Sequence, residues 1–330
     1  MNSTRLTQLI ATFATKRILV AGDLMLDEFV WGRVSRISPE APVPVVEVVS
    51  ESAYPGGAAN VARNLREFTG NTELLGIVGD DPAGARLLDL LNERGIGTRG
   101  VIVSGADRTI LKTRVIARQQ QVVRVDRDAR ATITPETLPQ IRNQLEGRIA
   151  QTDAIIFADY GKGFLTQDVV DLIAGIARPR GVPMIVDPNP NNPIAWRDMT
   201  AIKPNRIETT AALALPLNLD DEATLKEAAQ ALQDKWATGI VLITLGEHGM
   251  WLFEHGAAPY HTAARAKEVF DVSGAGDTAI SLFTLALVSG ATPQEAAEIA
   301  NAASGVVVGK LGTATLTPAE LLASMAGSNE

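Results

Sequence analysis

A chain of 330 residues with 46% hydrophobic content can bury a full core, in one large α/β domain or two smaller ones. A net charge of −8 and a pI of about 5.1 argue against a nucleic-acid partner or an anionic membrane surface. The absence of cysteine excludes disulfides, thiolate catalysis and cysteine-bound metals. Residues 1–16 are polar, and no apolar stretch reaches the ~20 residues of a membrane span, so we expect a soluble cytoplasmic protein.

The first 130 residues alternate between buried elements and extended segments. The buried elements expected here are strands at 18–22 and 73–78 and helices at 56–68 and 82–94. Four prolines between positions 39 and 55 forbid a helix in that part of the chain. Charged and apolar residues alternate in the second extended segment, as they do in an edge sheet. We therefore expect two extended excursions, at about 28–52 and 108–126, that can form a small second sheet.

From residue 136 onward, strands and helices alternate regularly. The expected helices are 136–149, 167–177, 206–213 and 222–236, and the expected strands are 154–158, 183–187, 201–203 and 240–244. A hairpin-like pair at 250–253 and 259–262 and two long helical patterns follow. This alternation is typical of a parallel, doubly wound α/β sheet. Because no linker is visible, we expect a single domain over residues 1–330.

The stretch DVSGAGDT at 271–278 runs into an apolar helical pattern that ends at Gly290. A glycine-rich loop at a helix start leaves backbone N–H groups without helical partners, at the positive end of the helix dipole. Such groups suit a phosphate or a phosphoryl group in transit. Asp277, in the first turn, is placed to take a proton from an attacking hydroxyl. The alternative is an ordinary glycine-rich turn in which Asp277 caps the helix.

Polar residues cluster where the expected strands end. The clusters are Asp23 with Asp27, and the segments 159–162, 187–189, 203–205 and 244–246. In a doubly wound sheet, ligands bind beyond the carboxyl ends of the strands. Polar clusters at five strand ends favour the phosphate interpretation of the 271–278 stretch over the capping alternative.

Two motifs resemble the signatures of the ribokinase-like (PfkB) carbohydrate kinases: GGAANVA at 56–62 and DVSGAGDT at 271–278. The first motif has two residues rather than three between Gly57 and Asn60, which departs from many relatives. Within the family, the chain is most similar to the kinases of heptose 7-phosphate. The stretches that carry this narrower resemblance are GDLMLD at 22–27, SRISPEAPVPVV at 35–46 and GVVVGKLGT at 305–313.

The resemblance implies a three-layer α/β/α fold with a mostly parallel central sheet, a small β-sheet lid, and homodimers formed through the lid. It implies transfer of the γ-phosphoryl group of ATP to the C1 hydroxyl of D-glycero-β-D-manno-heptose 7-phosphate, which gives the 1,7-bisphosphate. This reaction belongs to ADP-heptose synthesis for lipopolysaccharide. Bifunctional relatives carry a nucleotidyltransferase domain after the kinase.

The resemblance also assigns the catalytic and metal-binding roles. Asp277 is expected to be the catalytic base, and the expected anion hole consists of Gly274, Ala275 and Gly276. Asn205 and Glu208 are expected to organise Mg²⁺ and the phosphates through water, a role that suits an amide and a carboxylate. The family resemblance leaves open a monovalent cation near Asp271 and Ser273.

The remaining expected contacts concern ATP and the sugar. The ATP contacts are expected from Thr244, Gly246 and Asn301, and the sugar-hydroxyl contacts from Asp27, Gly57 and Asn60. The substrate phosphate needs a cation of its own, for which Lys162 and Arg118 are the candidates. Lys162 lies between two glycines after a strand, and Arg118 lies on the second excursion. For each of the two, the alternative is a solvated surface charge.

Other chemistries lack their motifs in this sequence. The Gly-x-Gly-x-x-Gly fingerprint is absent after the first strand, and the Gly-Lys-Ser/Thr of a P-loop is absent too. His248, His255 and His261 show no metal-ligand pairing. Two rival functions stay open: a kinase of the same family that acts on a non-phosphorylated sugar such as ribose or fructose, and a catalytically silent sugar- or nucleotide-binding regulator.

Overall fold

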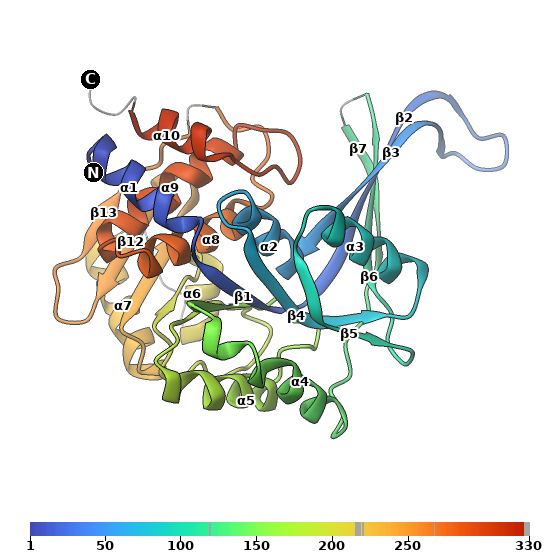
Figure 1. The fold of residues 1–330 in the computed structure, drawn as a ribbon. Helices are drawn as coiled ribbons and strands as arrows, with labels where there is room; N and C mark the ends of the chain where they lie inside the picture. The colour runs from blue at the N-terminus through green and yellow to red at the C-terminus, as the bar shows by residue number, and fades with distance from the viewer. Residues whose placement is uncertain (119, 215–218, 220, 267, 327–330) are drawn as a thin grey trace.

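The computed structural model describes residues 1–118, 120–214, 219, 221–266 and 268–326. Its centre is a nine-stranded sheet in the order β13-β12-β11-β10-β9-β8-β1-β4-β5 (Figure 1). The strands are β1 (Arg17–Gly22), β4 (Asn71–Gly79), β5 (Gly97–Ser104), β8 (Ala154–Ala158), β9 (Met184–Asp187), β10 (Ala201–Ile202), β11 (Ile240–Thr244), β12 (Met250–Glu254) and β13 (Tyr260–Thr262). Neighbouring strands from β5 to β11 are parallel, and β12 and β13 add an antiparallel edge.

Helices cover both faces of this sheet. In β1, Ile18 and Val20 pack into one buried cluster and Leu19 and Ala21 into the other, because successive strand side chains point to opposite faces. The helices of the first face are α1 (Ser3–Phe13), α2 (Ala58–Arg66), α3 (Pro82–Glu93), α8 (Ala275–Val288), α9 (Pro293–Val307) and α10 (Pro318–Ala326). Those of the second face are α4 (Thr137–Glu146), α5 (Gln167–Ala177), α6 (Arg206–Leu213) and α7 (Glu222–Trp236). The predicted three-layer α/β/α fold is confirmed.

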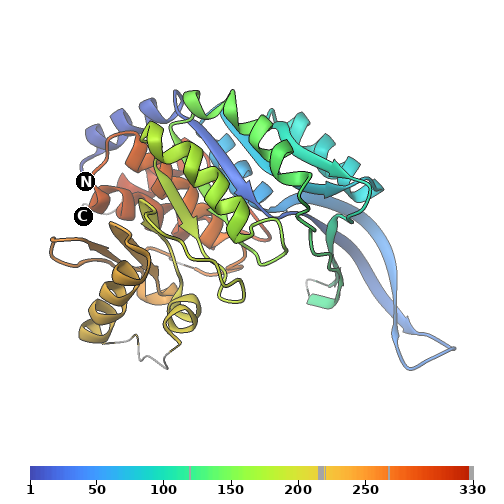
Figure 2. The same cartoon turned by 90° about the horizontal axis from the view of Figure 1, so that it is seen from below.

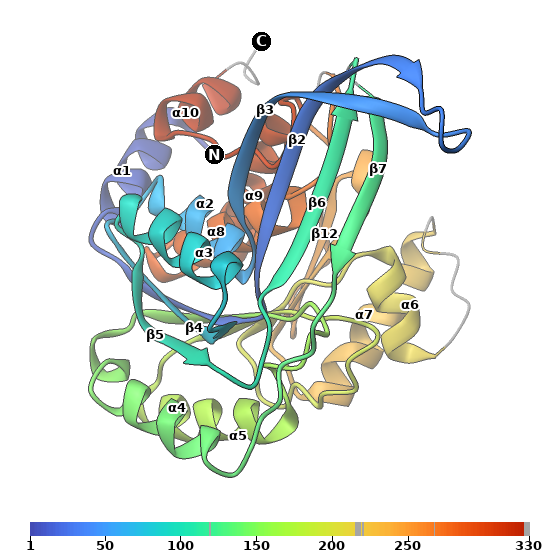
Figure 3. The same ribbon diagram turned by 90° about the vertical axis from the view of Figure 1, so that its right-hand side faces the viewer.

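A second sheet of four strands stands beside the main one (Figure 3). Its strands, in spatial order, are β3 (Pro44–Gly57), β2 (Leu24–Ile37), β6 (Ile110–Ala117) and β7 (Gln120–Arg127). The central pair β2–β6 is parallel and the two outer pairs are antiparallel. Because β2 starts two residues after β1 ends, the β2–β3 hairpin projects from the carboxyl edge of the main sheet (Figure 2). We call this four-stranded sheet the lid.

Several boundaries differ from the sequence expectation, and glycine explains three of the differences. The expected helix 136–149 ends at Glu146 because Gly147 follows, and a short 3₁₀ turn (Ile149–Gln151) comes after it. The expected helix 56–68 begins at Ala58, since Gly56 and Gly57 close strand β3. Strand β5 was not predicted from the sequence, because two glycines among its eight residues weaken the strand pattern.

Helices α2 and α8, which carry the two family motifs, pack directly against each other. The Thr278 hydroxyl in α8 donates to Oδ1 of Asn64 in α2 at 2.9 Å, and the Ser281 hydroxyl lies 3.2 Å from the carbonyl oxygen of Val61. Both bonds are buried, so they fix the start of α8 against α2. None of the helices in the described residues is long and apolar enough to cross a bilayer.

Replacing Gly57 with alanine should destabilise the fold. Gly57 has φ +59°, and a Cβ there would lie 2.6 Å from the carbonyl oxygen of Asp23. Left-handed strain plus this clash should lower the free energy of unfolding by about 1–3 kcal/mol. Urea unfolding measures the change, with Gly70→Ala as the matched control, because nothing lies within 4 Å of a Cβ at Gly70. Equal stability of the two variants would contradict this reading.

Candidate active site

The start of α8 combines a carboxylate with free backbone donors. Gly274 precedes the helix with φ +83°, and Asp277 lies in the first helical turn. Within the described residues, the N–H groups of Gly276 and Asp277 find no hydrogen-bond acceptor. These groups lie at the positive end of the helix dipole. An anion bound there would sit directly beside the Asp277 carboxylate.

Each oxygen of the Asp277 carboxylate accepts a hydrogen bond from a different part of the fold. The Tyr160 hydroxyl donates to Oδ1 at 2.5 Å, and Nδ2 of Asn60 donates to Oδ2 at 2.6 Å. Asn60 is anchored in α2, where Nδ2 of Asn64 donates to its carbonyl oxygen at 2.9 Å. Oδ1 of Asn60 is buried and has no partner among the described residues. A buried amide oxygen without a partner is unusual, and a hydrogen-bond donor on a bound ligand would satisfy it.

The surroundings of Asp277 bring its titration close to neutral pH. Burial raises the pKa of Asp277 to about 6, although the hydrogen bonds from Tyr160 and Asn60 lower it. The charge of Asp187 raises the pKa further, and the charge of Lys203 lowers it. With a pKa of about 6, the carboxylate is mostly ionised at pH 7 and can still accept a proton, as a general base must.

A buried ion pair lies under the same loop. Nζ of Lys203, directly after β10, is 2.8 Å from Oδ1 of Asp187, and the lysine side chain is almost fully buried. The ammonium also lies 3.5 Å from the place where a Cβ on Gly276 would stand. Burial lowers the pKa of Lys203, but Asp187 and Glu208 outweigh that effect and raise it overall. The raised pKa favours the protonated form of Lys203, whose ammonium lies beneath the N-terminus of α8.

Asn205 and Glu208 form a capping box at the start of α6. Oδ1 of Asn205 accepts the Glu208 N–H at 2.9 Å, and Oε2 of Glu208 accepts the Asn205 N–H at 2.7 Å. Burial, and next the charge of Asp187, raise the pKa of Glu208 to about 7. A buried carboxylate with a raised pKa gains from a nearby cation, so these oxygens fit a magnesium ion held through water. Across the described part of the chain, no three acidic, histidine or cysteine side chains converge as a metal site.

A pocket of about 880 Å³ opens next to the α8 loop. The expected ATP residues Thr244, Gly246 and Asn301 line it, together with Ala275 and Gly276 of the expected anion hole. Asp277 and Asn60 are not among its lining residues. The 274–277 loop therefore has the pocket on one side and the Asn60 side chain of α2 on the other.

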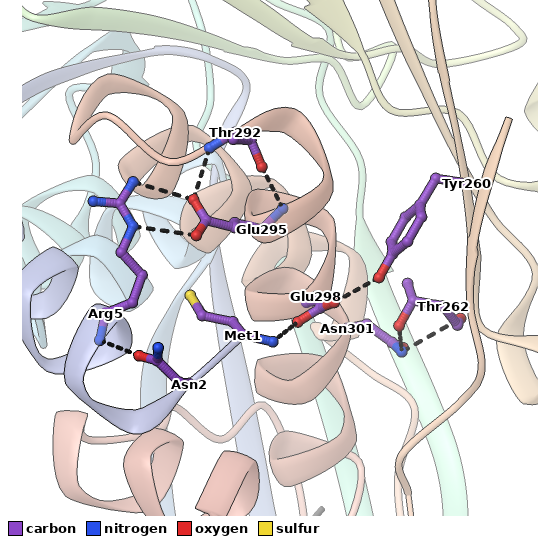
Figure 4. Close-up of polar contacts among 9 residues, drawn as sticks. All are labelled: Met1, Asn2, Arg5, Tyr260, Thr262, Thr292, Glu295, Glu298 and Asn301. Atoms are coloured by element: carbon purple, nitrogen blue, oxygen red, sulfur yellow. Dashed lines mark hydrogen bonds and ion pairs between the residues drawn. The ribbon is translucent and has the colours of Figure 1, made fainter. Parts of the chain in front are cut away.

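Asn301 contributes to this pocket from α9, and Figure 4 shows how it is held. Its Nδ2 donates to Oγ1 of Thr262 at 2.9 Å and to the carbonyl oxygen of Ala263 at 2.6 Å. One turn earlier in α9, Glu298 accepts the Tyr260 hydroxyl at 2.5 Å and the amino terminus of Met1 at 3.0 Å. These bonds tie α9 to β13 and to the start of the chain, and so fix one wall of the pocket.

The lid contributes Asp27 and an arginine that the sequence did not single out. Asp27, in β2, is buried, and NH1 of Arg114 in β6 lies 2.5 Å from its Oδ1. The guanidinium also stands over the Phe29 ring, 5.3 Å from its centroid. Gly56 packs against the same carboxylate, since a Cβ there would lie 2.2 Å from Oδ2. Asp27, Gly56 and Gly57 thus lie together where β2 leaves and β3 rejoins the body of the protein, which we call the root of the lid.

The structure separates the two candidate phosphate-binding cations. Nζ of Lys162 is paired with Oδ1 of Asp128 at 2.7 Å, and its loop follows β8 at the carboxyl edge of the main sheet. Arg118 is exposed at the turn after β6, with φ +49°. Lys112 stands opposite Asp27 in the register of β6 against β2, and Arg118 lies six residues further along the chain. Arg118 is therefore roughly 20 Å from the root of the lid. The structure does not bring Arg118 to the site.

Sequence reasoning missed four side chains of this site: Tyr160, Asp187, Lys203 and Arg114. Three of them belong to strand-end clusters that the sequence did mark, but their individual partners are set by the fold. Arg114 is one of several alternating charges on the second excursion, and the register of β6 against β2 selects it. Only the paired strands place it next to Asp27.

Comparison with known proteins gives matches along most of the chain. Residues 15–320 match the family described as pfkB family carbohydrate kinase. The bifunctional protein HldE of Desulfatibacillum aliphaticivorans is 42% identical over 316 residues, which cover 96% of this chain and 64% of that protein. HldE of Citrifermentans bemidjiense is 43% identical, with 94% and 63% covered. The chain thus spans slightly less than two thirds of the length of these relatives.

Solved structures share the fold at lower identity. A ribokinase of Arabidopsis thaliana in complex with ribose and ATP superposes with a TM-score of 0.72 at 17% identity, covering 94% of this chain and 99% of that one. Phosphofructokinase-2 of Escherichia coli in complex with potassium has a TM-score of 0.76 at 19% identity, covering 95% and 99%. From the match over residues 15–320 and the identities above 40%, the chain belongs to the pfkB family of carbohydrate kinases.

Proposed function

We propose that this kinase transfers the γ-phosphoryl group of ATP to the C1 hydroxyl of D-glycero-β-D-manno-heptose 7-phosphate, in ADP-heptose synthesis for the lipopolysaccharide core. The observation that carries the proposal is the 274–277 loop, which has a nucleotide-sized pocket on one side and Asn60 on the other. The choice of a heptose phosphate is supported by the stretches at 22–27, 35–46 and 305–313. Relatives named HldE at 40–43% identity support it as well.

In the proposed mechanism, the oxygen of the sugar hydroxyl attacks the γ-phosphorus while Asp277 takes the hydroxyl proton. The bond between the γ-phosphorus and the β-phosphate oxygen breaks, and ADP leaves. The free N–H groups at residues 276 and 277 hold the moving phosphoryl group, with Gly274 and Ala275 shaping the loop. Lys203 adds positive charge from below that loop. These donors are in place before the reaction, so little reorganisation opposes the developing charge.

Magnesium, when bound, neutralises part of the phosphate charge, and Asn205 and Glu208 are the residues that would hold it through water. Thr244, Gly246 and Asn301 would bind ATP in the 880 Å³ pocket. We also propose a monovalent cation beside Asp271 and Ser273, because both side chains have oxygen atoms that can coordinate a cation.

On the sugar side, Asp27, Gly57 and Asn60 would contact the hydroxyl groups, and the unpartnered Oδ1 of Asn60 supports that role. Lys162 would bind the 7-phosphate after leaving Asp128, while the distance of Arg118 from the root of the lid argues against its use.

We further propose a cytoplasmic enzyme with one kinase domain over residues 1–330 that forms a homodimer through the lid. The exposed apolar side chains of the lid support such a contact, since a monomer gains nothing by presenting them to water. They are Ile37, Val43, Val48, Val49, Val122, Val123 and Val125.

The acid limb of the pH–rate profile should report Asp277. Protonation removes its capacity to accept the hydroxyl proton, so kcat/KM should fall about tenfold per unit below pH 6 and level off above pH 7. A coupled ADP-release assay between pH 5 and 9 measures kcat/KM. Magnesium is kept at a high concentration, because a nearby cation favours the ionised form of Glu208.

The matched variant is Asp277→Asn, which keeps the size of the side chain and removes the base. Its kcat should fall by about 10²–10⁴-fold at every pH, while calorimetry finds ATP binding within a few-fold of wild type. Unchanged turnover in this variant would contradict the proposed mechanism.

Substrate choice can be tested together with Lys162. Wild-type kcat/KM should be far higher for heptose 7-phosphate than for ribose, fructose or fructose 6-phosphate. Lys162→Ala should raise the KM for the heptose phosphate by roughly tenfold to a hundredfold and leave the KM for ATP unchanged, because a charge-assisted phosphate contact is lost.

Lys16→Ala is the control for this experiment, since Lys16 also pairs with an aspartate but lies before β1, at the opposite edge of the sheet. Preferred turnover of ribose or fructose, with no effect of Lys162→Ala, would point to a kinase of non-phosphorylated sugars. No turnover on any of the sugars would favour a silent binding protein.

A further inference from the structure

The loop after β8 is held by two buried carboxylates that take no part in the proposed phosphoryl transfer. Asp23 accepts the backbone N–H groups of Tyr160, Lys162 and Phe164 at 3.1, 3.0 and 2.9 Å. Asp159 accepts the N–H of Gly161 at 2.8 Å and is nearly as well buried as Asp23. Four of the five N–H groups between residues 160 and 164 are thereby fixed, which restrains this loop although it has little regular structure.

The side chain of Tyr160 extends from this loop across the edge of the sheet to α8. The backbone of Tyr160 is anchored on Asp23, and its phenol reaches Oδ1 of Asp277, where the hydroxyl donates at 2.5 Å. Burial, and next the charge of Asp277, raise the pKa of Tyr160 well above its usual value of 10, so the phenol stays the donor at all working pH values. Asn60 donates to the other oxygen at 2.6 Å.

Two donors on opposite oxygens fix both the plane and the charge of a carboxylate. A carboxylate held by a single donor can rotate about its Cβ–Cγ bond, whereas one held at both oxygens keeps its remaining lone pairs in one direction. Hydrogen bonds to the ionised form also favour that form. The other charged groups that act on Asp277 are Asp187 from β9, Lys203 after β10 and Arg63 from α2.

We infer that Tyr160 is a positioning residue: its hydroxyl, together with the amide of Asn60, aligns the Asp277 carboxylate with the acceptor hydroxyl and keeps it ionised at neutral pH. This inference rests on the proposed role of Asp277 as the base. It assigns a function to the DYGKG loop at 159–163 beyond the phosphate contact proposed for Lys162. The buried Asp23 and Asp159 then serve to hold the phenol in place.

Tyr160→Phe tests the inference, because it removes one oxygen atom and keeps the ring. The acid limb of kcat/KM should move up by about one pH unit, since the ionised carboxylate loses a donor. Above the limb, kcat should fall roughly tenfold, while the KM for ATP stays within twofold of wild type. A variant with the wild-type acid limb, whatever its rate, would overturn the inference.

Tyr260→Phe is the matched control, as its hydroxyl also donates to a carboxylate at 2.5 Å, but to Glu298 on α9 (Figure 4). Its acid limb should stay at the wild-type pH. Carbon-13 NMR of labelled aspartate, with Asp277→Asn to assign the signal, follows the Asp277 titration in wild type and Tyr160→Phe without any turnover. A higher midpoint in Tyr160→Phe supports the inference, and an equal midpoint overturns it.

The same set of variants separates this inference from the proposed function. If Asp277→Asn is inactive and Tyr160→Phe has an unshifted limb, Asp277 stands as the base and the role of Tyr160 fails. If Asp277→Asn retains turnover, the proposed base itself is wrong, and the positioning role falls with it.

Discussion

The site depends on keeping one carboxylate charged inside the protein. Burial raises the pKa of Asp277 and so favours its neutral form, and the charge of the neighbouring Asp187 works in the same direction. The fold opposes both effects with two hydrogen-bond donors, Tyr160 after β8 and Asn60 on α2, and with the positive charge of Lys203 after β10. The outcome is a pKa of about 6, low enough for an ionised group at pH 7 and high enough for proton transfer.

The same edge of the sheet also joins the kinase body to its lid. Asp23 directly follows β1, anchors the loop that carries Tyr160, and directly precedes β2 of the lid. Asp27 follows four residues later and is held by Arg114 from the parallel neighbour β6. The root of the lid and the loop that carries Tyr160 therefore share one anchor, the Asp23 carboxylate.

Much of the fold was predictable from the sequence because its elements have strong local start signals. Helices α5, α6 and α7 match the expected ranges residue for residue, and side chains of Thr166, Asn205 and Asp221 cap their N-termini. Strands β8 and β11 are equally clear, as buried apolar runs between polar clusters. Strand β5, which contains two glycines, and the helix boundaries near Gly57 and Gly147 could not be predicted from the sequence. Strand pairing and close packing determine them.

The sequence marked many residues of the candidate site, but neither their contacts nor the individual roles of Tyr160, Asp187, Lys203 and Arg114. Tyr160 and Asn60 meet Asp277 across 117 and 217 residues of sequence, so no local pattern relates them. The pairing of Lys162 with Asp128 depends in the same way on how the lid strand β7 returns to the main sheet. Motif resemblance pointed to the candidate reacting groups, while the side chains that contact them emerged from the packing.

The most direct test of this account is a crystal structure with ADP, magnesium, aluminium fluoride and heptose 7-phosphate, in which the fluoride complex stands in for the phosphoryl group in transit. We expect the C1 oxygen within hydrogen-bond distance of Asp277, and the fluoride complex against the N–H groups of residues 276 and 277. A complex that turns another hydroxyl toward the fluoride, or leaves Asp277 remote from C1, would contradict it.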